Sequence, residues 1–166
     1  MKCKRSMALI AFLIFLGIPC SIQAGGQEWD PEEIFSWVAR QLGVLPGEER
    51  PRIVELPEQE FREQFLKSTE KSLKRLRESL IGMGWDRVEA SNYLENLTKD
   101  VAGFLTKKDL QIYIKGSLEP CYKASIVAHE ITHFFQVKYN LLGEEVREFQ
   151  AEHIERKYRE EYCPRP

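Results

Sequence analysis

The chain has 166 residues, a formal net charge of −2 and 30% charged residues, with acidic and basic side chains interleaved. This length suits one domain built around one hydrophobic core. Because the chain is mildly acidic and its charges are mixed, we predict no nucleic-acid partner.

The N-terminal segment differs in composition from the rest of the chain. Three basic residues precede the apolar run MALIAFLIFLGI, Pro19 follows it, and the small residue Ala24 stands before two glycines. This order is typical of a secretory signal peptide, and the run is shorter than the about 20 apolar residues that span a membrane. We predict that residues 1–24 are a signal peptide, with a retained N-terminal anchor as the alternative.

Removal of this segment defines the mature protein. The loss of Lys2, Lys4 and Arg5 leaves a net charge of −5 on residues 25–166, which we expect to form a single domain without a stable membrane span. The predicted location is outside the cytoplasm, either periplasmic or secreted. Nothing in the sequence indicates an oligomeric state.

Two helices and a strand are expected in the first part of the mature chain. Residues 30–43 predict a helix, because Asp30 can cap it, Pro31 fits its first turn and Gly43 can end it. The β-branched residues of PRIVEL, 51–56, predict a short strand. Residues 57–84 predict a long amphipathic helix. The side of this helix expected to be buried comprises Phe61, Phe65, Leu73, Leu76 and Leu80.

The second part combines a hairpin with helices. A third helix is expected over 86–97, and the apolar alternation within 101–116 predicts a β-hairpin. Helices over 118–139 and 144–162 follow. This order predicts an α+β fold, mostly helical, with a small antiparallel sheet or hairpin packed against the helix at 118–139.

Two cysteines remain after signal removal. Cys121 and Cys163 form an even pair in an exported chain, which predicts a disulfide worth about 4 kcal/mol in the chain-entropy model. Two free buried thiols are the alternative. The bridge would join the C-terminal tail to the start of the helix at 118–139.

The sequence VAHEITHFF, residues 127–135, contains the strongest functional signal. On a helix, His129 and His133 face the same way about 6 Å apart, so both can bind one Zn²⁺ ion. Glu130 borders this site and can take a proton from a metal-bound water. The flanking residues are uncharged, which favours a zinc site over two unpaired histidines on a buried helix.

The third zinc ligand is expected from the last helix. Its core-facing stripe is centred near Ala151, and Glu148 lies at the edge of this stripe near the helix start. Glu148 is therefore the predicted ligand and Glu152 the reserve. Glu155 has a suitable angle but lies about 10 Å further along the axis.

The pattern HEITH followed by Glu148-Phe-Gln-Ala151 resembles the H-E-x-x-H…E-x-x-A pattern of small gluzincin-type zinc metallopeptidases, including minimal secreted bacterial members. The resemblance covers residues ~100–160. It implies a zincin-like domain in which His129, His133 and Glu148 bind zinc and Glu130 is general base and acid. In such families the strand before the motif helix pairs with an extended peptide, which implies this role for residues 110–115. The alternative is a strand that only covers the helix.

The larger members of that family also use a tyrosine or histidine to stabilise the oxyanion. The sequence does not identify this group. The candidates are Tyr113, Tyr139, His153 and Tyr158.

We therefore predict an exported zinc-dependent metallopeptidase acting on a peptide or protein substrate. The main alternative is a zinc-stabilised binding or inhibitory module that has lost turnover. A metal-free helical interaction protein is the third possibility. The substrate, the cleavage preference and the role of residues 25–99 do not follow from the sequence.

Overall fold

The computed structural model describes residues 29–163. The predicted signal peptide lies outside this range. Within it, no helix is both long enough and apolar enough to cross a membrane.

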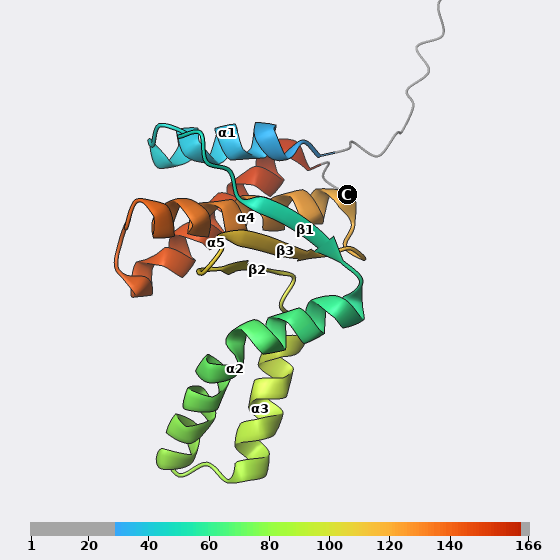
Figure 1. Ribbon diagram of the computed structural model, residues 1–166, viewed down its shortest axis with the longest axis vertical. Coiled ribbons are helices and arrows are strands. Elements are labelled where there is room, and N and C mark those ends of the chain that lie inside the picture. The colour runs from blue at the N-terminus through green and yellow to red at the C-terminus, as the bar shows by residue number, and fades with distance from the viewer. Residues whose placement is uncertain (1–28, 164–166) are drawn as a thin grey trace, which may run out of the picture.

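The described residues form a mostly helical α+β fold with five helices and three strands (Figure 1). In chain order the elements are α1 (Pro31–Leu42), β1 (Arg52–Leu56), α2 (Glu58–Gly82), α3 (Arg87–Lys99), β2 (Gly103–Thr106), β3 (Gln111–Lys115), α4 (Pro120–Lys138) and α5 (Glu144–Tyr162). The α+β class and the positions of all eight elements agree with the prediction.

The sheet is mixed, with strand order β1–β3–β2. β2 and β3 form the predicted hairpin, in which Phe104 lies opposite Tyr113. β1 pairs with the other edge of β3 in the parallel direction, with Val54 beside Tyr113. The expectation of an antiparallel sheet is therefore wrong for β1. The long crossover through α2 and α3 allows β1 to run parallel to β3.

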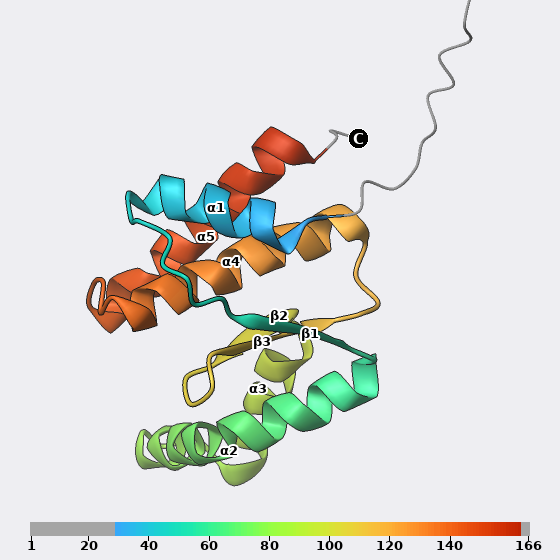
Figure 2. The same cartoon turned by 45° about the horizontal axis from the view of Figure 1, so that its top comes forward.

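Helices cover both faces of the sheet (Figures 1 and 2). On one face, Ile112 and Ile114 of β3 are fully buried in a core formed with α1, α4 and α5. On the opposite face, Tyr113 stacks on Phe104, which in turn contacts Phe61 of α2. The side chains of β3 thus alternate between two packed layers, as its apolar alternation predicts.

The ends of α1 follow the expected capping pattern. Asp30 accepts a hydrogen bond from the Glu32 amide, and Gly43 ends the helix with φ = 66°, a conformation that glycine adopts without strain. On α2, by contrast, the predicted buried side is only partly confirmed. Phe61 and Leu80 are buried, whereas Leu76 is 37% exposed.

A disulfide joins Cys121 in the first turn of α4 to Cys163 at the end of α5, with 5.7 Å between the Cα atoms. The predicted pairing is thus present in the structure. It fixes one end of the α4–α5 pair.

Candidate metal centre

Two histidines of α4 lie on one side of the helix, one turn apart. The rings of His129 and His133 meet edge to face with centroids 4.8 Å apart, and their Nε2 atoms are separated by 3.1 Å. The helix is buried on several sides, so its backbone position is fixed by packing against α1, α5 and the sheet. The histidine pair is therefore held on a rigid element.

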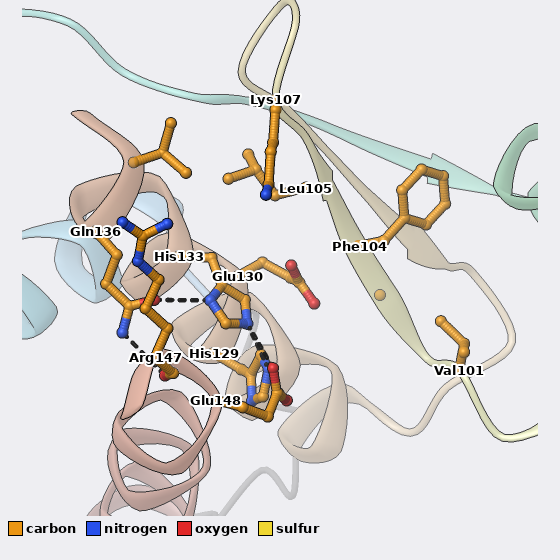
Figure 3. Close-up of a pocket in the computed structure, with 12 residues that line it drawn as sticks. Val101, Phe104, Leu105, Lys107, His129, Glu130, His133, Gln136, Arg147 and Glu148 are labelled. Atoms are coloured by element: carbon orange, nitrogen blue, oxygen red, sulfur yellow. Dashed lines mark hydrogen bonds and ion pairs between the residues drawn. The ribbon is translucent and has the colours of Figure 1, made fainter. Parts of the chain in front are cut away.

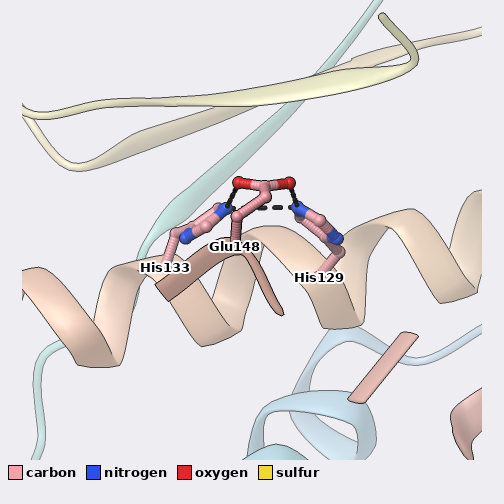
Figure 4. Close-up of side chains that lie close together, drawn as sticks. All are labelled: His129, His133 and Glu148. Carbon is pink, nitrogen blue, oxygen red and sulfur yellow. Dashed lines mark hydrogen bonds and ion pairs between the residues drawn. The ribbon is translucent and has the colours of Figure 1, made fainter. Parts of the chain in front are cut away.

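Glu148 reaches the two histidines from α5 (Figure 4). Its Oε1 atom lies 3.2 Å from Nε2 of His129, and its Oε2 atom lies 3.2 Å from Nε2 of His133. These three residues are brought together as a group that can hold a metal ion, as the sequence predicts. Glu152 is exposed and does not belong to this group.

Gln136 determines which nitrogen of His133 carries hydrogen. The Gln136 side-chain amide donates hydrogen bonds to the Arg147 carbonyl and to Oε1 of Gln150, each at 2.9 Å. Its Oε1 atom is thereby left as the acceptor that faces Nδ1 of His133 at 2.8 Å. Nδ1 of His133 is therefore the donor to Gln136, and Nε2 is the ring nitrogen that faces Glu148.

Glu155 of α5 lies beside the other histidine, His129. Its Oε2 atom lies 3.2 Å from the buried Nδ1 of His129. The angle at this contact does not satisfy a hydrogen bond, and Nδ1 has no other partner among the described residues. The contact places a carboxylate beside a candidate metal ligand, an arrangement that is common at metal sites.

The donor set is suited to a cation. The two Nε2 atoms lie 3.1 Å apart, and each lies 3.2 Å from a different oxygen of Glu148. Lone pairs that face one another at these distances repel unless a proton or a metal ion lies among them. Zinc ligands about 2.1 Å from a tetrahedral ion are about 3.4 Å apart, close to these separations. Two imidazoles and one carboxylate also match a known catalytic zinc ligand set.

Protons compete with a metal ion for the same atoms. Although burial disfavours the charged ring, the contacts with Glu148 and Glu155 raise the pKa of His129 to about 10. Burial likewise opposes the charging of His133, but Glu148 raises its pKa above the ordinary value. Hydrogen bonds from both rings lower the pKa of Glu148. Metal binding must therefore displace protons from the histidines.

Glu130 lies beside the donor set without joining it. Its side chain is oriented toward a cavity between β2 and α4, where Figure 3 shows the carboxylate next to His133. Glu130 is only 5% exposed, and this burial raises the pKa of its carboxyl. A carboxyl with a raised pKa, placed beside a metal-binding group, is suited to take up and release a proton.

The cavity has a volume of about 450 Å³ and is bounded by β2 on one side and by α4 and α5 on the other. Gly103 allows β2 to approach Glu130 closely. A Cβ atom at this position would lie 2.6 Å from Ile126 Cγ2, 2.9 Å from Ile114 Cδ1 and 3.3 Å from Glu130 Cγ. The missing side chain therefore sets the distance between the strand and the carboxylate.

The strand that borders the cavity is β2. β3, which contains most of the predicted segment 110–115, is paired on both sides and has no free edge for a peptide. The assignment of strand addition to 110–115 is therefore wrong. The strand order leaves the outer edge of β2 unpaired within the described sheet.

None of the four predicted oxyanion candidates lines the cavity. Tyr113 bonds to Gln111, Tyr139 donates to the Leu45 carbonyl, His153 contacts Arg156, and Tyr158 packs against Trp37. The cationic side chains that do line it are Lys107 and Arg147. Arg147 also donates to the carbonyls of Leu141 and Leu142, which ties down the α4–α5 turn.

The sequence did not indicate the supporting roles of Gln136, Glu155 and Gly103. Gln136 lies one turn after His133 on the same helix, so the i to i+3 spacing could have identified it. Glu155 and Gly103 depend on tertiary packing. Comparisons of the chain with family models, curated proteins and solved structures found no match.

Proposed function

We propose that the protein is an exported, zinc-dependent peptidase with a zincin-like domain. The observation that carries this proposal is the position of Glu130, a buried carboxyl next to three converging metal donors. A purely structural metal site has no need for an additional carboxyl in an adjoining cavity.

His129, His133 and Glu148 would hold the zinc ion. Gln136 and Glu155 would keep the two rings oriented so that both Nε2 lone pairs face the ion. Bound zinc would supply Lewis acidity, which polarises a carbonyl group and makes water acidic enough to lose a proton near neutral pH.

Glu130 would act as general base and then as general acid. Its raised pKa favours uptake of a proton from the attacking water and its later transfer to the leaving amine. The cavity shields this carboxyl from bulk solvent and so maintains the raised pKa. The positively charged Arg147 side chain at the cavity wall is available to interact with negative charge on the substrate.

An extended peptide is the substrate class that best fits the cavity. The outer edge of β2 carries backbone groups that can pair with a peptide backbone, and Gly103 brings this edge within reach of Glu130. An exported location is supported by the disulfide, because such bonds persist in oxidising compartments.

A zinc-stabilised binding or inhibitory module is the second candidate. It is favoured by the position of the four predicted oxyanion candidates, all of which lie outside the cavity lining. The two functions require the same ligands but differ in their need for Glu130.

The substitution Glu130→Gln separates these functions. The amide keeps the size of the side chain but cannot accept the proton, so we expect peptide hydrolysis to fall by at least about 100-fold while zinc content is unchanged. Both properties are measured on the same preparation, with a mixed peptide library as substrate and elemental analysis for zinc. Wild-type protein that is fully loaded with zinc and cleaves no library member would contradict the peptidase assignment.

A further inference from the structure

Two basic side chains line the cavity from opposite walls. Lys107 lies in the turn between β2 and β3, and Arg147 lies near the start of α5, directly before Glu148. Figures 1 and 2 show the β2–β3 turn and the α4–α5 turn at the same end of the domain. In Figure 3 the Lys107 side chain extends from the hairpin toward α4. The basic groups of the cavity are therefore gathered at one of its ends.

The Arg147 side chain is held in place without an acidic partner. Its Nε atom donates to the carbonyls of Leu141 and Leu142, each at 3.2 Å, and Nη2 lies 3.4 Å from Oδ1 of Asn140. All three acceptors are uncharged. Among the side chains that the structure describes, Arg147 forms no ion pair, and its Nη1 group has no acceptor. The fork of a guanidinium matches the two oxygens of a carboxylate.

The α4–α5 turn that holds Arg147 has a strained backbone. Asn140 has φ = 49° and Leu142 has φ = 61°, a left-handed conformation that leucine rarely adopts. Such strain persists only where surrounding contacts fix it, and it is common at ligand sites. The hydrogen bonds from Arg147 to this turn are contacts of that kind. The guanidinium is thus fixed in position before any ligand binds.

The acidic groups near this end have other contacts. Of the two acids that line the cavity, Glu148 contacts both histidines and Glu130 is buried beside them. In the β2–β3 turn, Asp109 accepts a hydrogen bond from Thr106. Bound zinc would offset the charges of Glu130 and Glu148, so Lys107 and Arg147 would make the lining positive overall.

We propose that Lys107 and Arg147 select peptides that carry a carboxylate group, either on an aspartate or glutamate side chain or at the C-terminus. A carboxylate at this end of the cavity would gain charged hydrogen-bond donors, whereas an amide of the same size would gain much less and a basic side chain would be repelled. The inference rests on the proposed binding of a peptide in the cavity, but it does not require turnover.

The position of the carboxylate along the peptide follows from β2. Lys107 lies four positions after Gly103, which is beside Glu130. An extended peptide on this strand rises about 3.3 Å per residue, and the lysine side chain reaches part of the way back toward Glu130. The carboxylate is therefore expected about two to four residues from the peptide bond that lies beside Glu130.

Peptide binding to zinc-loaded Glu130→Gln protein tests the proposal, because this variant should hold peptides without cleaving them. Fluorescence anisotropy compares a neutral peptide that is blocked at both ends, the same peptide with one glutamate placed at each position in turn, and the neutral peptide with a free C-terminal carboxylate. We expect a peptide with a carboxylate to bind about tenfold more tightly than the neutral one. Tighter binding of a glutamate peptide assigns a side chain as the source, and tighter binding of the free acid assigns the C-terminus.

Substitutions at the two basic residues identify the groups that select. Lys107→Gln should lower the preference for a carboxylate about three- to tenfold, and Lys107→Glu should invert it in favour of a lysine-containing peptide. Lys108→Gln is the matched control, because Lys108 is exposed in the same turn but does not line the cavity. Its preference should equal that of the parent protein. At equal zinc content, Arg147→Lys should retain more of the preference than Arg147→Gln.

Two results would overturn the proposal. One is equal binding of neutral and carboxylate-containing peptides by the zinc-loaded protein, and the other is an unchanged preference in both Lys107→Gln and Arg147→Gln. Wild-type protein distinguishes this failure from that of the peptidase assignment. Selective binding without hydrolysis would contradict turnover and leave the selection intact, whereas hydrolysis that is indifferent to carboxylates would do the reverse.

Discussion

Gln136 links the metal donors to the α4–α5 turn. Its amide donates to the Arg147 carbonyl and its oxygen accepts from His133, so one side chain fixes both the ring and the residue next to Glu148. Orientation of this kind decides whether a histidine presents a lone pair or a proton to the metal. At the scale of single residues, the metal centre therefore depends on more than its ligands.

Replacement of Gln136 by Met should weaken zinc binding. The variant keeps the volume but loses the hydrogen bond to His133, so we expect zinc affinity to fall by about 10- to 100-fold. Competition with a chromophoric chelator measures the affinity. Gln59→Met, on the exposed surface of α2, is the control and should leave zinc affinity unchanged. Equal affinities for wild type and Gln136→Met would refute the orienting role.

Gly103→Ala should disturb the cavity without removing zinc. The Cβ atom of an alanine at position 103 would lie less than 3.0 Å from side-chain atoms of Ile126 and Ile114, so β2 must shift away from Glu130. We expect unfolding free energy to fall by about 1–3 kcal/mol and hydrolysis to decrease, while zinc content stays constant. Denaturant unfolding and peptide cleavage give the two values.

Gly82→Ala provides the comparison for this substitution. No atom lies within 4 Å of the Cβ position at Gly82, and alanine favours a helix, so stability should be unchanged or slightly higher. A Gly103→Ala protein as stable and active as Gly82→Ala would show that β2 is not constrained by the missing side chain.

At the scale of elements, the α4–α5 pair is joined at two places. The disulfide connects Cys121 to Cys163, and the metal donors connect His129 and His133 to Glu148. Glu148 lies 15 positions before Cys163, which corresponds to about 22 Å along α5. The two connections therefore act on opposite ends of the same helix.

Removal of the disulfide should affect stability more than zinc binding. The double substitution Cys121→Ser with Cys163→Ser should lower the unfolding free energy by about 4 kcal/mol, because the unfolded chain regains the freedom of a long loop. Zinc affinity should change by less than about fivefold, since the donors lie at the distant end of α5. Denaturant unfolding and chelator competition measure these two quantities. A large loss of zinc affinity would indicate that the disulfide positions Glu148.

The helices and the β-hairpin could be predicted because their signals are local. Asp30, Pro31 and Gly43 mark α1, and alternating residues mark β3. The parallel pairing of β1 could not be predicted, because it depends on contacts between residues more than 50 positions apart. For the same reason the sequence alone indicates peptide pairing by residues 110–115, although the free edge that borders the cavity belongs to β2.

The metal donors could be predicted for a similar reason. His129, Glu130 and His133 lie within five residues, and the angle of Glu148 follows from the periodicity of α5. The contact of Glu155 with His129 could not be predicted from helix positions alone. It depends on the crossing of α4 and α5, which places Glu155 beside the buried Nδ1 atom.

For the whole molecule, the charges of the donor set link stability to pH. In the metal-free protein, His129 has a pKa raised from 6.5 to about 10, so its stabilising contribution is complete below 6.5 and is lost as pH rises toward 10. The pKa of Glu148 is lowered from 4.5, so its contribution is complete above 4.5 and is lost as pH falls further.

In the metal-free protein, these charged groups should therefore add most to the free energy of unfolding between about pH 4.5 and 6.5. The further stabilisation that zinc binding gives should increase from pH 5 to pH 8. Zinc binding at pH 8 should release at least about one proton, because His129 is still protonated there. Calorimetric titrations in buffers of different ionisation enthalpy count the protons. Binding without proton release would contradict the raised pKa of His129.

Zinc content tests the metal centre most directly. We predict about one zinc ion per chain for wild type and for Glu152→Ala, and a loss of most of the zinc for Glu148→Ala, because only Glu148 meets both histidines. Elemental analysis of the three proteins, purified in parallel and shown to be folded by circular dichroism, gives the answer. Equal zinc in wild type and Glu148→Ala, or no zinc in folded wild type, would contradict the assignment of this site.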